Sequence, residues 1–351
     1  MRVAWRWAMA LVLALALGGV FAAAKSALAA DEPQLDPRFE FGGFRKPGNW
    51  YKGNLHLHST ISDGRLDPVP TVEAYRQLGY DFTALTDHIG GFRDKQTKAF
   101  RPLVYPLEQL NKPGFLVIPG IEYDTNRNGE TIHYVAVGPG YDARLEEGED
   151  VSHAIQESWD KGAFVFIAHP HWSLDSTQVT EGIAFLPGLE VFNYATWLGE
   201  GDRGNSELHW DRLLRLRRRV LGVATDDCHD VTHHAGGGWV MVKAPELTAA
   251  AIVGALRDGQ YYASSGPVIH DVWFDTESNL RVRCTPAKYV RAFAGVGKVS
   301  QAAAKPGEVM LDATIKWNWK SGNSILPFVR VEVTDEQGRT AWSQAAPGPG
   351  K

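Results

Sequence analysis

Cysteine is scarce in this chain, which has only Cys228 and Cys284 among its 351 residues. So few cysteines exclude a small fold held together by several disulfides. We assign the two residues to different domains, and Cys228 also lies within a histidine-rich motif, so we expect both thiols to be unpaired. No general base can be assigned to Cys228, which favours a packed thiol over a nucleophile at that position.

Two catalytic signatures and an excess of positive charge are also missing. The sequence contains neither a Gly-x-Ser-x-Gly nucleophile elbow nor a Walker phosphate-binding loop, so serine hydrolases and nucleoside triphosphatases are poorly supported.

Lys and Arg number 36 against 41 Asp and Glu, which gives a formal net charge of −5. A net-acidic chain has no overall field that attracts nucleic acid, whose binding depends largely on phosphate neutralisation. We therefore expect no nucleic-acid partner and a small-molecule substrate, which can still be anionic because metal ions would dominate the local field.

The first residues predict export. Arg2 and Arg6 precede an apolar run at residues 8–24, and Ala27-Leu28-Ala29 offers a small-x-small cleavage site. A retained membrane anchor is the alternative, since the run approaches spanning length. The small residues and the lack of a second apolar span favour cleavage, which leaves a periplasmic or secreted chain with no integral membrane span. Removing Arg2, Arg6 and Lys25 with the segment moves the formal charge from −5 to −8.

The central part of the chain alternates short apolar runs with amphipathic stretches. The runs are rich in Val, Ile and Phe and are bounded by Gly, Pro, Asp or His, as is typical of buried parallel strands. They lie at residues 81–85, 115–118, 132–137, 163–168, 188–192, 220–224 and 239–242. Helical spacing occurs at residues 71–78, 151–160, 208–219 and 249–258. This repetition predicts an α/β fold with a parallel sheet or a closed barrel.

The pattern changes after Ser264-Ser265-Gly266-Pro267. Residues 268–274, 280–284, 309–319 and 327–333 alternate with period two and have no helical segments between them, which predicts a small antiparallel β-sandwich. The chain therefore divides into a signal peptide at residues 1–29, an N-terminal arm at 30–47, a barrel domain at 48–265, a β-sandwich domain at 266–345 and a tail at 346–351.

Histidines and carboxylates recur at the ends of the predicted strands. His56-Leu57-His58 lies in an extended segment, where residues two apart point the same way, so both imidazoles can reach one ion. Asp63 follows in a loop and can return as an oxygen ligand. Further candidates at or near strand ends are Asp87, His88, Glu122, His133, His169, His171, Glu190, Asp226, Asp227 and His229.

The joint recurrence of these residues predicts a metal site. A lone His or Asp after a strand is more often a cap or a surface residue, but so many at the same kind of position are hard to reach by accident. Parallel strands of a closed sheet end at one mouth, where barrel enzymes hold their active sites. His combined with Asp and Glu suits Zn, Mn or Fe rather than Ca²⁺ or Cu(I). We therefore expect two or three divalent metal ions.

In the motifs that carry these histidines and carboxylates, the chain resembles a known family, the PHP (polymerase and histidinol phosphatase) superfamily. The motifs that carry the resemblance are Gly53-Asn54-Leu55-His56-Leu57-His58, Ser62-Asp63-Gly64, Thr86-Asp87-His88, Gly120-Ile121-Glu122, His169-Pro170 and Asp227-Cys228-His229. Residues 224–229, with Ser264-Ser265-Gly266-Pro267 before a β-domain, are similar to the exported, carbaryl-hydrolase-like branch. The resemblance covers about residues 50–340. It implies a distorted (β/α)₇ barrel with a di- or trinuclear metal site.

The resemblance also implies a set of metal ligands. Carried over by motif, they are His56, His58, Asp63, His88, Glu122, His133, His169, Asp227 and His229. His133 has the least regular placement, because the Glu-to-His interval varies among members. Asp226 stands where many relatives have Ser, so it stays open as a ligand or a proton-transfer group. His171 stays open as a residue that orients the substrate or merely belongs to the loop.

Two other features have both a functional and a structural interpretation. Asp87 could accept a hydrogen bond from a ligand imidazole or cap a turn, and we favour the first. A basic run could clamp phosphate, but such a run is more often a solvated helix face near a C-terminus. It consists of Arg212, Arg215, Arg217, Arg218 and Arg219.

Together these observations predict a metal-dependent hydrolase that uses a metal-activated water. Phosphoester bonds, in diesters or monoesters, come first because most of the superfamily resembles phosphoesterases. Hydrolysis of a carbamate, ester or amide on the same site is the alternative, which the branch resemblance supports. A third hypothesis is an inactive barrel that serves as a binding or surface-interaction protein. Against it, every motif position retains a residue that can bind metal.

Overall fold

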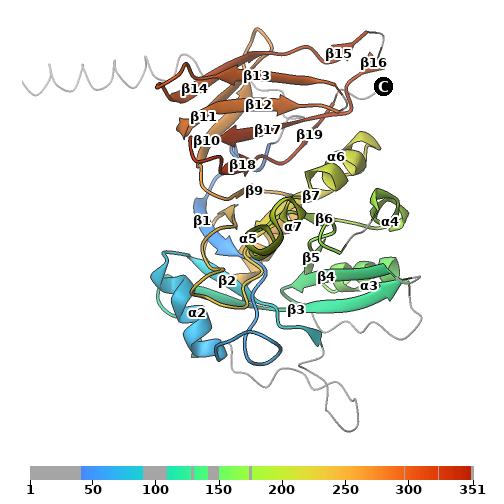
Figure 1. Ribbon diagram of the computed structural model, residues 1–351, viewed down its shortest axis with the longest axis vertical. Helices are drawn as coiled ribbons and strands as arrows, with labels where there is room; N and C mark the ends of the chain where they lie inside the picture. Colours follow the sequence, from blue (N-terminus) through green and yellow to red (C-terminus); the bar gives the residue numbers. More distant parts are fainter. Residues whose placement is uncertain are drawn as a thin grey trace, which may run out of the picture.

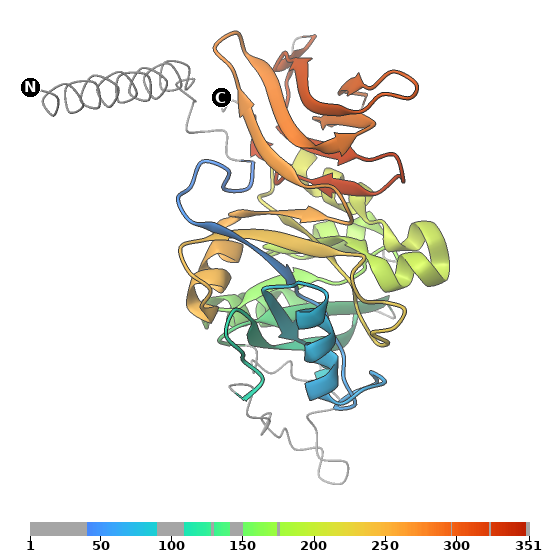
Figure 2. The same ribbon diagram turned by 90° about the vertical axis from the view of Figure 1, so that its left-hand side faces the viewer.

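The computed structural model describes residues 41–89, 109–127, 130–140, 150–173, 176–295, 297–322 and 324–348. The predicted signal peptide at residues 1–29, much of the arm and the last residues of the tail lie outside this part of the chain. We call residues 49–264 the α/β part and residues 269–347 the β part. Figures 1 and 2 show the β part stacked on one end of the α/β part.

The α/β part contains strands and helices in alternation. Its strands are β1 (Asn49–Asn54), β2 (Phe82–Leu85), β3 (Leu116–Arg127), β4 (Glu130–Val137), β5 (Phe164–Ile167), β6 (Gly188–Asn193), β7 (Leu221–Thr225), β8 (Trp239–Ala244) and β9 (Tyr261–Ser264). Its helices are α2 (Pro68–Gln77), α3 (Val151–Asp160), α4 (Thr177–Gly182), α5 (Tyr194–Glu200), the 3₁₀ helix η3 (Gly201–Gly204), α6 (Glu207–Arg215) and α7 (Ala249–Asp258). The predicted α/β class is confirmed.

The sheet of the α/β part is mixed rather than parallel throughout. β1, β2 and β3 run parallel, and so do β5, β6 and β7. β4 is antiparallel to both of its neighbours, and β8 is antiparallel to β1 and β9. The prediction of parallel strands at residues 132–137 and 239–242 was therefore wrong, because an apolar run shows burial but not direction. The sheet curls so that β7 comes back against β8 and β9, while the count of seven β/α units stays a prediction.

Helix bounds follow from local chemistry. α3 begins after Asp150, whose side chain accepts a hydrogen bond from the Ser152 amide, and α7 ends before Gly259 in the left-handed conformation. Both helices have the predicted bounds. α6 ends at Arg215, short of the predicted residue 219, because Arg217 adopts a φ of 60° that no helix accommodates.

The basic run at the end of α6 holds neighbouring elements rather than forming a phosphate clamp. Arg212 pairs with Glu181, with 2.5 Å between Nε and Oε1. Arg218 donates to the carbonyl oxygen of Ile183, and Arg219 to that of Asp258 at the end of α7. Cations beside carbonyl groups that end a helix complement its dipole. The structural interpretation of the run is the one that the contacts support.

The β part is made of antiparallel strands. They are β10 (Ile269–Phe274), β11 (Asn279–Ala287), β12 (Tyr289–Phe293), β13 (Val299–Ala303), β14 (Met310–Lys316), β15 (Lys320–Ser321), β16 (Ser324–Ile325), β17 (Phe328–Thr334), β18 (Thr340–Trp342) and β19 (Ala346–Pro347). β10, β11 and β14 form one sheet, and β13, β12, β17 and β18 belong to the other. Buried residues such as Val272, Val282, Val290 and Val331 form a common apolar core with members on both sheets.

The two cysteines lie in separate cores and are not bonded to each other. Cys228 is buried beside Leu57 and Tyr75, and Cys284 is buried in the core of the β part. Burial raises the pKa of the Cys228 thiol to about 12, against an opposing hydrogen bond with Tyr75. The expected unpaired, packed thiols are confirmed. In the described residues, the helices are all too short or too polar to cross a membrane.

The two parts share one continuous sheet. β18 pairs with β9, so the sheet of the α/β part continues into the β part. Trp342 packs into the apolar core of the α/β part, and the Gln344 side chain makes hydrogen bonds to both the amide and the carbonyl of Gly222. The predicted boundary near residue 265 thus lies at a point where strands, not a linker, connect the two parts, and the domain limits stay a prediction.

A buried ion cluster lies at this junction. Arg330 on β17 has a fully buried side chain, donates to both carboxylate oxygens of Asp211 on α6, and pairs with Glu207 and Glu332. Three carboxyl groups face one guanidinium, which leaves excess negative charge in a low-dielectric site. Burial and Glu207 raise the pKa of Glu332 to about 8, although Arg330 acts in the opposite direction. The raised pKa favours the protonated form of Glu332 at neutral pH.

We expect Glu332→Gln to remove a pH dependence of stability. Because the folded-state pKa of Glu332 is raised, its contribution to folding is complete below the unfolded pKa and is lost as the pH rises through about 8. Gln reproduces the protonated acid, so the variant should match the parent at pH 4, below the unfolded pKa, and exceed it by at least about 1 kcal/mol at pH 9. Chemical denaturation at the two pH values measures this. If the free energy of unfolding had the same pH dependence in parent and variant, the raised pKa of Glu332 would be contradicted.

Candidate metal centre

Strand ends bring the predicted ligands to one place. The segment after β1 pairs with the segment after β7 through a parallel bridge between Leu57 and Cys228, which sets His56 and His58 beside Asp227. A second parallel bridge joins His88 to Glu122. Within the described residues, three overlapping groups have ligand atoms within 4.8 Å of one another. They are His58, Asp63, His88 and His229; His56, His58, Glu122 and Asp227; and His88, Glu122, Asp124 and His133.

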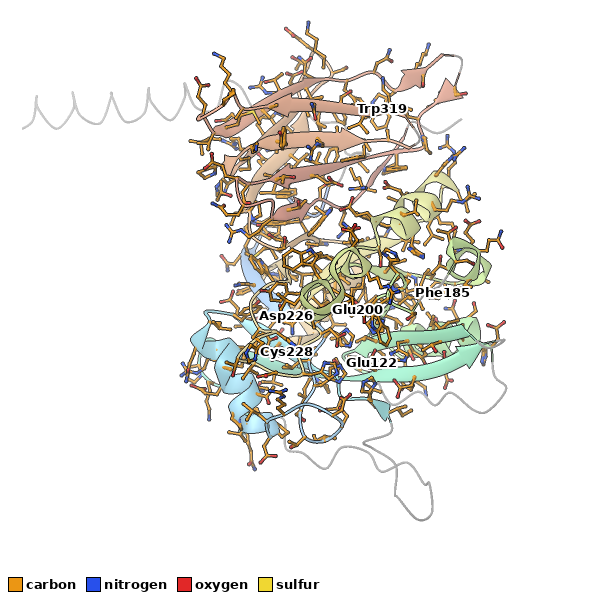
Figure 3. The ribbon with its side chains drawn as sticks, in the orientation of Figure 1. Glu122, Phe185, Glu200, Asp226, Cys228 and Trp319 are labelled. Atoms are coloured by element: carbon orange, nitrogen blue, oxygen red, sulfur yellow. The ribbon has the colours of Figure 1, made fainter. Side chains whose placement is uncertain are left out.

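Glu122 lies in the middle of the cluster. Its Oε2 is 3.0 Å from His56 Nε2 and 3.2 Å from His58 Nε2. Its Oε1 is 3.0 Å from His133 Nδ1 and 3.2 Å from His169 Nε2, which brings His169 to the cluster as well. The carboxylate is buried and contacts four imidazoles from three segments of the chain. Figure 3 shows Glu122 in the α/β part with Asp226 and Cys228, away from Trp319 in the β part.

Asp227 faces Glu122 across the two buried histidines. Its Oδ1 is 3.1 Å from His58 Nε2 and 3.3 Å from His56 Nε2. Asp227 has a φ of 48° and His169 a φ of 28°, which are uncommon values for residues other than glycine. Such backbone conformations concentrate at functional sites, where the surrounding structure holds them.

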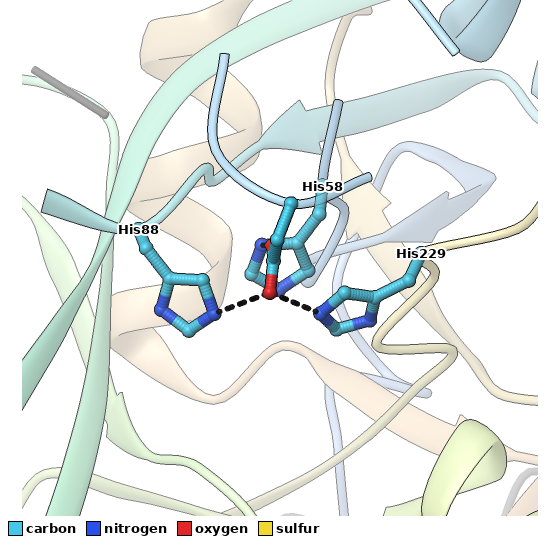
Figure 4. Close-up of side chains that lie close together, drawn as sticks. His58, His88 and His229 are labelled. Atoms are coloured by element: carbon cyan, nitrogen blue, oxygen red, sulfur yellow. Dashed lines mark ion pairs between the residues drawn. The ribbon is translucent and has the colours of Figure 1, made fainter. Parts of the chain in front are cut away.

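Asp63 covers the solvent side of the cluster, and its side chain is 54% exposed. Its carboxylate lies 3.4 Å from His229 Nε2, 3.6 Å from His88 Nε2 and 3.5 Å from His58 Nδ1. Figure 4 shows His58, His88 and His229 pointing toward one carboxylate. The loop thus returns Asp63 to the histidines, as the sequence predicts.

The spacing of the donor atoms fits metal coordination. Ligands bound to one ion at about 2.0–2.2 Å lie about 3.0–3.5 Å apart. The four contacts that His56 Nε2 and His58 Nε2 make with Glu122 and Asp227 measure 3.0–3.3 Å. One imidazole N–H cannot make two strong hydrogen bonds at once, whereas both oxygens can share an ion with the nitrogen. Nitrogen with carboxylate oxygen is the donor set of Zn, Mn and Fe.

The electrostatics are those of a cation site. Burial opposes ionisation of Glu122, but His56, His133 and His169 hold its pKa well below the usual range. Despite burial, the pKa of His88 rises to about 9 beside Asp124 and Glu122, and that of His229 rises to about 9 beside Asp63 and Asp227. The carboxylates therefore require positive charge next to them, from protonated imidazoles or from metal ions.

Glu190 and Asn193 fix the orientation of the buried ligands. Glu190 Oε1 lies 3.2 Å from His56 Nδ1, and its other oxygen accepts a hydrogen bond from the His169 amide. The Asn193 amide group donates to Glu190 Oε2 at 2.8 Å and to Asp227 Oδ2 at 3.0 Å. A carboxylate on the far nitrogen of an imidazole sets its tautomer and directs Nε2 toward a metal.

Asp87 does not contact a ligand imidazole. Its carboxylate accepts hydrogen bonds from the amides and hydroxyls of Ser59 and Ser62. It therefore caps the loop that carries Asp63, and the interpretation that we favoured from the sequence was wrong. The direction of a side chain just after a strand depends on the loop that follows, which the strand pattern does not show.

Asp226 points away from the cluster. Its carboxylate accepts hydrogen bonds from the backbone amides of Gly236, Gly237 and Gly238 and from the Tyr75 hydroxyl. Burial raises the pKa of Asp226 to about 6, although these hydrogen bonds lower it. Its position therefore gives no support to the predicted role as ligand or proton-transfer group. Asp226 instead holds the glycine loop against the strand end that carries Asp227.

We expect Asp226→Asn to destabilise the protein without changing its metal content. An Asn side chain has one acceptor oxygen and would turn N–H groups toward backbone donors, which costs about 1–3 kcal/mol for each unsatisfied buried group. Thermal unfolding and metal analysis of the purified variant measure the two effects. Loss of bound metal from a variant that remains folded would instead identify Asp226 as a ligand.

His171 lies beside the cluster but not in it. Its Nδ1 is 2.8 Å from the carbonyl oxygen of Asn205, and none of the ligand groups found in the described residues includes it. The predicted role in orienting substrate therefore finds no contact that supports it. Sequence reasoning missed Asp124, whose Oδ1 lies 2.6 Å from His88 Nδ1, and Trp172, whose ring packs at 4.7 Å against His169.

Comparisons with known proteins give partial matches. No protein-family model matches the chain. Two curated relatives are similar to it: the DNA polymerase/3'-5' exonuclease PolX of Bacillus subtilis, 25% identical over 174 residues, and a 5'-3' exoribonuclease of Haemophilus influenzae, 34% identical over 88 residues. These alignments cover 48% and 24% of this chain, and 28% of each relative.

Solved structures with a similar arrangement include two proteins at low identity. A two-domain protein of Bacteroides vulgatus, described as containing a predicted PHP-like metal-dependent phosphoesterase, is 20% identical with a TM-score of 0.47, over 90% of this chain and 98% of its own. A candidate metal-dependent phosphoesterase of Bifidobacterium adolescentis is 19% identical with a TM-score of 0.33, over 51% and 87%. The first of these neighbours is described as PHP-like, and the likeness of this chain to the carbaryl-hydrolase-like branch stays a prediction.

Proposed function

We propose that this protein is a metal-dependent hydrolase that cleaves phosphoester bonds. The observation that carries the proposal is the meeting of imidazoles and carboxylates from six separate segments in three overlapping ligand groups. Structural ion pairs rarely gather this many histidines around two buried carboxylates, because each protonated imidazole repels the others. A site for divalent cations accounts for the whole arrangement.

The ligand groups differ in burial. The buried ligands would hold metal, and the exposed ligands would face the incoming substrate. His56, His58 and Glu122 are buried and would hold the innermost metal together with Asp227. His88, His229, Asp63 and Asp124 are more exposed and form the side from which a substrate approaches. Bound divalent cations supply Lewis acidity and make water a stronger nucleophile at neutral pH. Two or three such ions, of Zn, Mn or Fe, would fit the groups.

The residues around the ligands keep the site in one geometry. Glu190 contacts His56, Asn193 donates a hydrogen bond to Asp227, and Asp87 fixes the loop that carries Asp63. The Trp172 ring packs against His169, and the Trp172 indole nitrogen donates a hydrogen bond to Glu200. A fixed set of ligands avoids reorganisation during the reaction, which is the main benefit of such a site.

Phosphoester bonds are favoured over carbamates and esters by the relatives. Both curated relatives are named as exonucleases, which act on phosphodiester bonds. Each alignment covers 28% of the relative, so only the class of bond is carried over, not the nucleic acid. The acidic charge of the chain disfavours nucleic acid, which leaves a small phosphoester as the proposed substrate.

A substrate panel tests the proposal. The full chain, purified with Mn²⁺ or Zn²⁺, should hydrolyse bis(p-nitrophenyl) phosphate or p-nitrophenyl phosphate, and a chelator should abolish the activity. Turnover of an aryl carbamate or acetate with no turnover of either phosphate would favour the carbamate/ester alternative. Bound metal without turnover on the whole panel would favour an inactive binding protein.

Export completes the proposal. It is based on the signal-peptide pattern at residues 1–29, which lies outside the described residues. A periplasmic or secreted hydrolase would have Ala30 or Asp31 as its first residue, and N-terminal sequencing of the mature protein from the host measures this. An intact Arg2–Arg6 segment on a membrane-bound protein would favour the anchor.

A further inference from the structure

A cavity lies between the two parts of the protein and is separate from the ligand groups. It has a volume of about 450 Å³ and is lined by residues of α5 and η3 on one side and of the turn between β17 and β18 on the other. Cavities of this size at the junction of two domains commonly bind small molecules. None of the metal-ligand candidates lines it.

One wall of this junction cavity is aromatic. The rings of Tyr194 and Trp197 are nearly parallel, with an interplanar angle of 15° and centroids 6.1 Å apart. Trp197 is 47% exposed, which is unusual for the largest apolar side chain. Tyr194 packs directly over Gly237, where a Cβ would lie 2.2 Å from its ring. The wall is therefore a fixed aromatic surface open to a ligand.

The other walls are polar and contain both donors and acceptors. Asp202, Asn205 and Glu207 line the α/β side, and Gln337, Arg339 and Thr340 line the β side. Arg339 donates to Asp335, with 2.8 Å between Nε and Oδ2, so its charge is already compensated. Asp202 and Glu207 then leave the cavity slightly acidic, which disfavours a phosphate or carboxylate ligand.

The polar wall is held in place before any ligand arrives. Glu207 accepts hydrogen bonds from Trp342 Nε1 at 2.9 Å and from Asn205 Nδ2 at 3.1 Å, and it faces Arg330 at 3.3 Å. Pairing with Arg330 also offsets the charge of Glu207, so the cavity lacks the concentrated negative charge that would select a cation. A preorganised site loses less free energy when it orders a ligand.

We propose that the junction cavity binds a neutral carbohydrate. An aromatic surface can stack against the apolar face of a pyranose ring, and planar carboxyl, amide and guanidinium groups beside it can bind adjacent hydroxyls. Trp197 and Tyr194 form the stacking surface, while Asn205, whose amide group is held by Glu207, and Gln337 line the cavity as hydroxyl partners. The site does not depend on the proposed hydrolase activity.

The cavity nevertheless borders the metal centre through two short connections. Asn193, whose side chain contacts Asp227, caps the start of α5, which carries Tyr194 and Trp197. Gly236 and Gly237 line the cavity while their amides bind Asp226. A bound sugar would therefore lie next to the loops that shape the metal centre.

Isothermal titration of the full chain with methyl glycosides and disaccharides tests the proposal. Saturable binding of at least one neutral sugar is expected, with the same Kd before and after chelation of metals. Trp197→Ala should raise that Kd at least about tenfold, since exposed aromatic anchors dominate such sites. Leu208→Ala, an exposed apolar residue outside the cavity, should leave Kd unchanged.

Several outcomes would overturn the proposal. One is the absence of binding across the sugar panel, and another is an unchanged Kd in Trp197→Ala. A third is binding of choline, adenosine or inorganic phosphate in competition with, and more tightly than, every sugar. Because Trp197 is exposed, its variant should unfold at the same temperature as the parent, which separates a lost contact from a lost fold. Sugar binding that disappears on chelation would contradict the independence of the two sites.

Discussion

Replacing His58 with alanine is expected to lower kcat/KM by about three orders of magnitude or more and to reduce bound metal by at least one equivalent. His58 belongs to two of the ligand groups, and its Nε2 lies 3.1 Å from Asp227 and 3.2 Å from Glu122. Removing it would weaken coordination on the buried side and the exposed side together. Activity on bis(p-nitrophenyl) phosphate and metal analysis of the purified variant measure both effects.

A matched histidine provides the control for this prediction. His233 is on the loop after Asp227, has a side chain 69% exposed and pairs with Asp230 outside the ligand groups. His233→Ala should retain metal content and activity within about twofold. Because His58 is buried, His58→Gln and a thermal unfolding curve separate lost coordination from lost structure. Full activity in either His58 variant would reject the metal centre as the site of hydrolysis.

Much of the α/β part could be predicted because its elements carry local signals. α3 and α7 have the predicted bounds since an Asp cap and a left-handed Gly mark their ends. Strand direction carries no such signal. β4 has the same buried apolar pattern as the parallel strands, and only its pairing with β3 and β5 shows that it is antiparallel.

The candidate site could be predicted where a residue type and a strand end coincide. Asp124 was missed although the same rule would have found it. It lies two residues after Glu122 in an extended strand, just as His58 follows His56, so both side chains lie on one face. Asp87 and Asp226 show the limit of the rule, because their carboxylates bind loops that the sequence does not place.

The junction between the two parts could not be predicted from local patterns. Arg330 and Asp211 are 119 positions apart, and an arginine in an alternating strand reads as a solvent-facing residue. The structure instead buries it between Trp210 and Phe293, with carboxylates from both parts around it. Such a contact depends on how the folded α/β part packs against the folded β part, which local sequence patterns do not show.

Arg330→Met is therefore expected to destabilise the protein by about 3–5 kcal/mol at pH 8. Removing the cation leaves Asp211, Glu207 and Glu332 close together with no positive partner in the cluster, and breaking a buried ion pair in this way is far more costly than losing a surface pair. Chemical denaturation at pH 8 measures the loss. Arg339→Met is the control, because the Arg339 side chain is 56% exposed and its buried partner Asp335 keeps the hydrogen bonds from the Gln337 and Arg339 amides, so a loss below about 1 kcal/mol is expected.

The pH dependence of the Arg330→Met defect distinguishes charge from packing. Without Arg330 the carboxyl groups would take up protons more readily, so their folded-state pKa values would rise and the variant would lose stability as the pH increases. The deficit at pH 5.5 should accordingly be smaller than at pH 8, and adding Glu332→Gln should recover part of it at pH 8. An equal deficit at both pH values, with no recovery in the double variant, would mean that the arginine acts by filling space between Trp210 and Phe293 rather than by its charge.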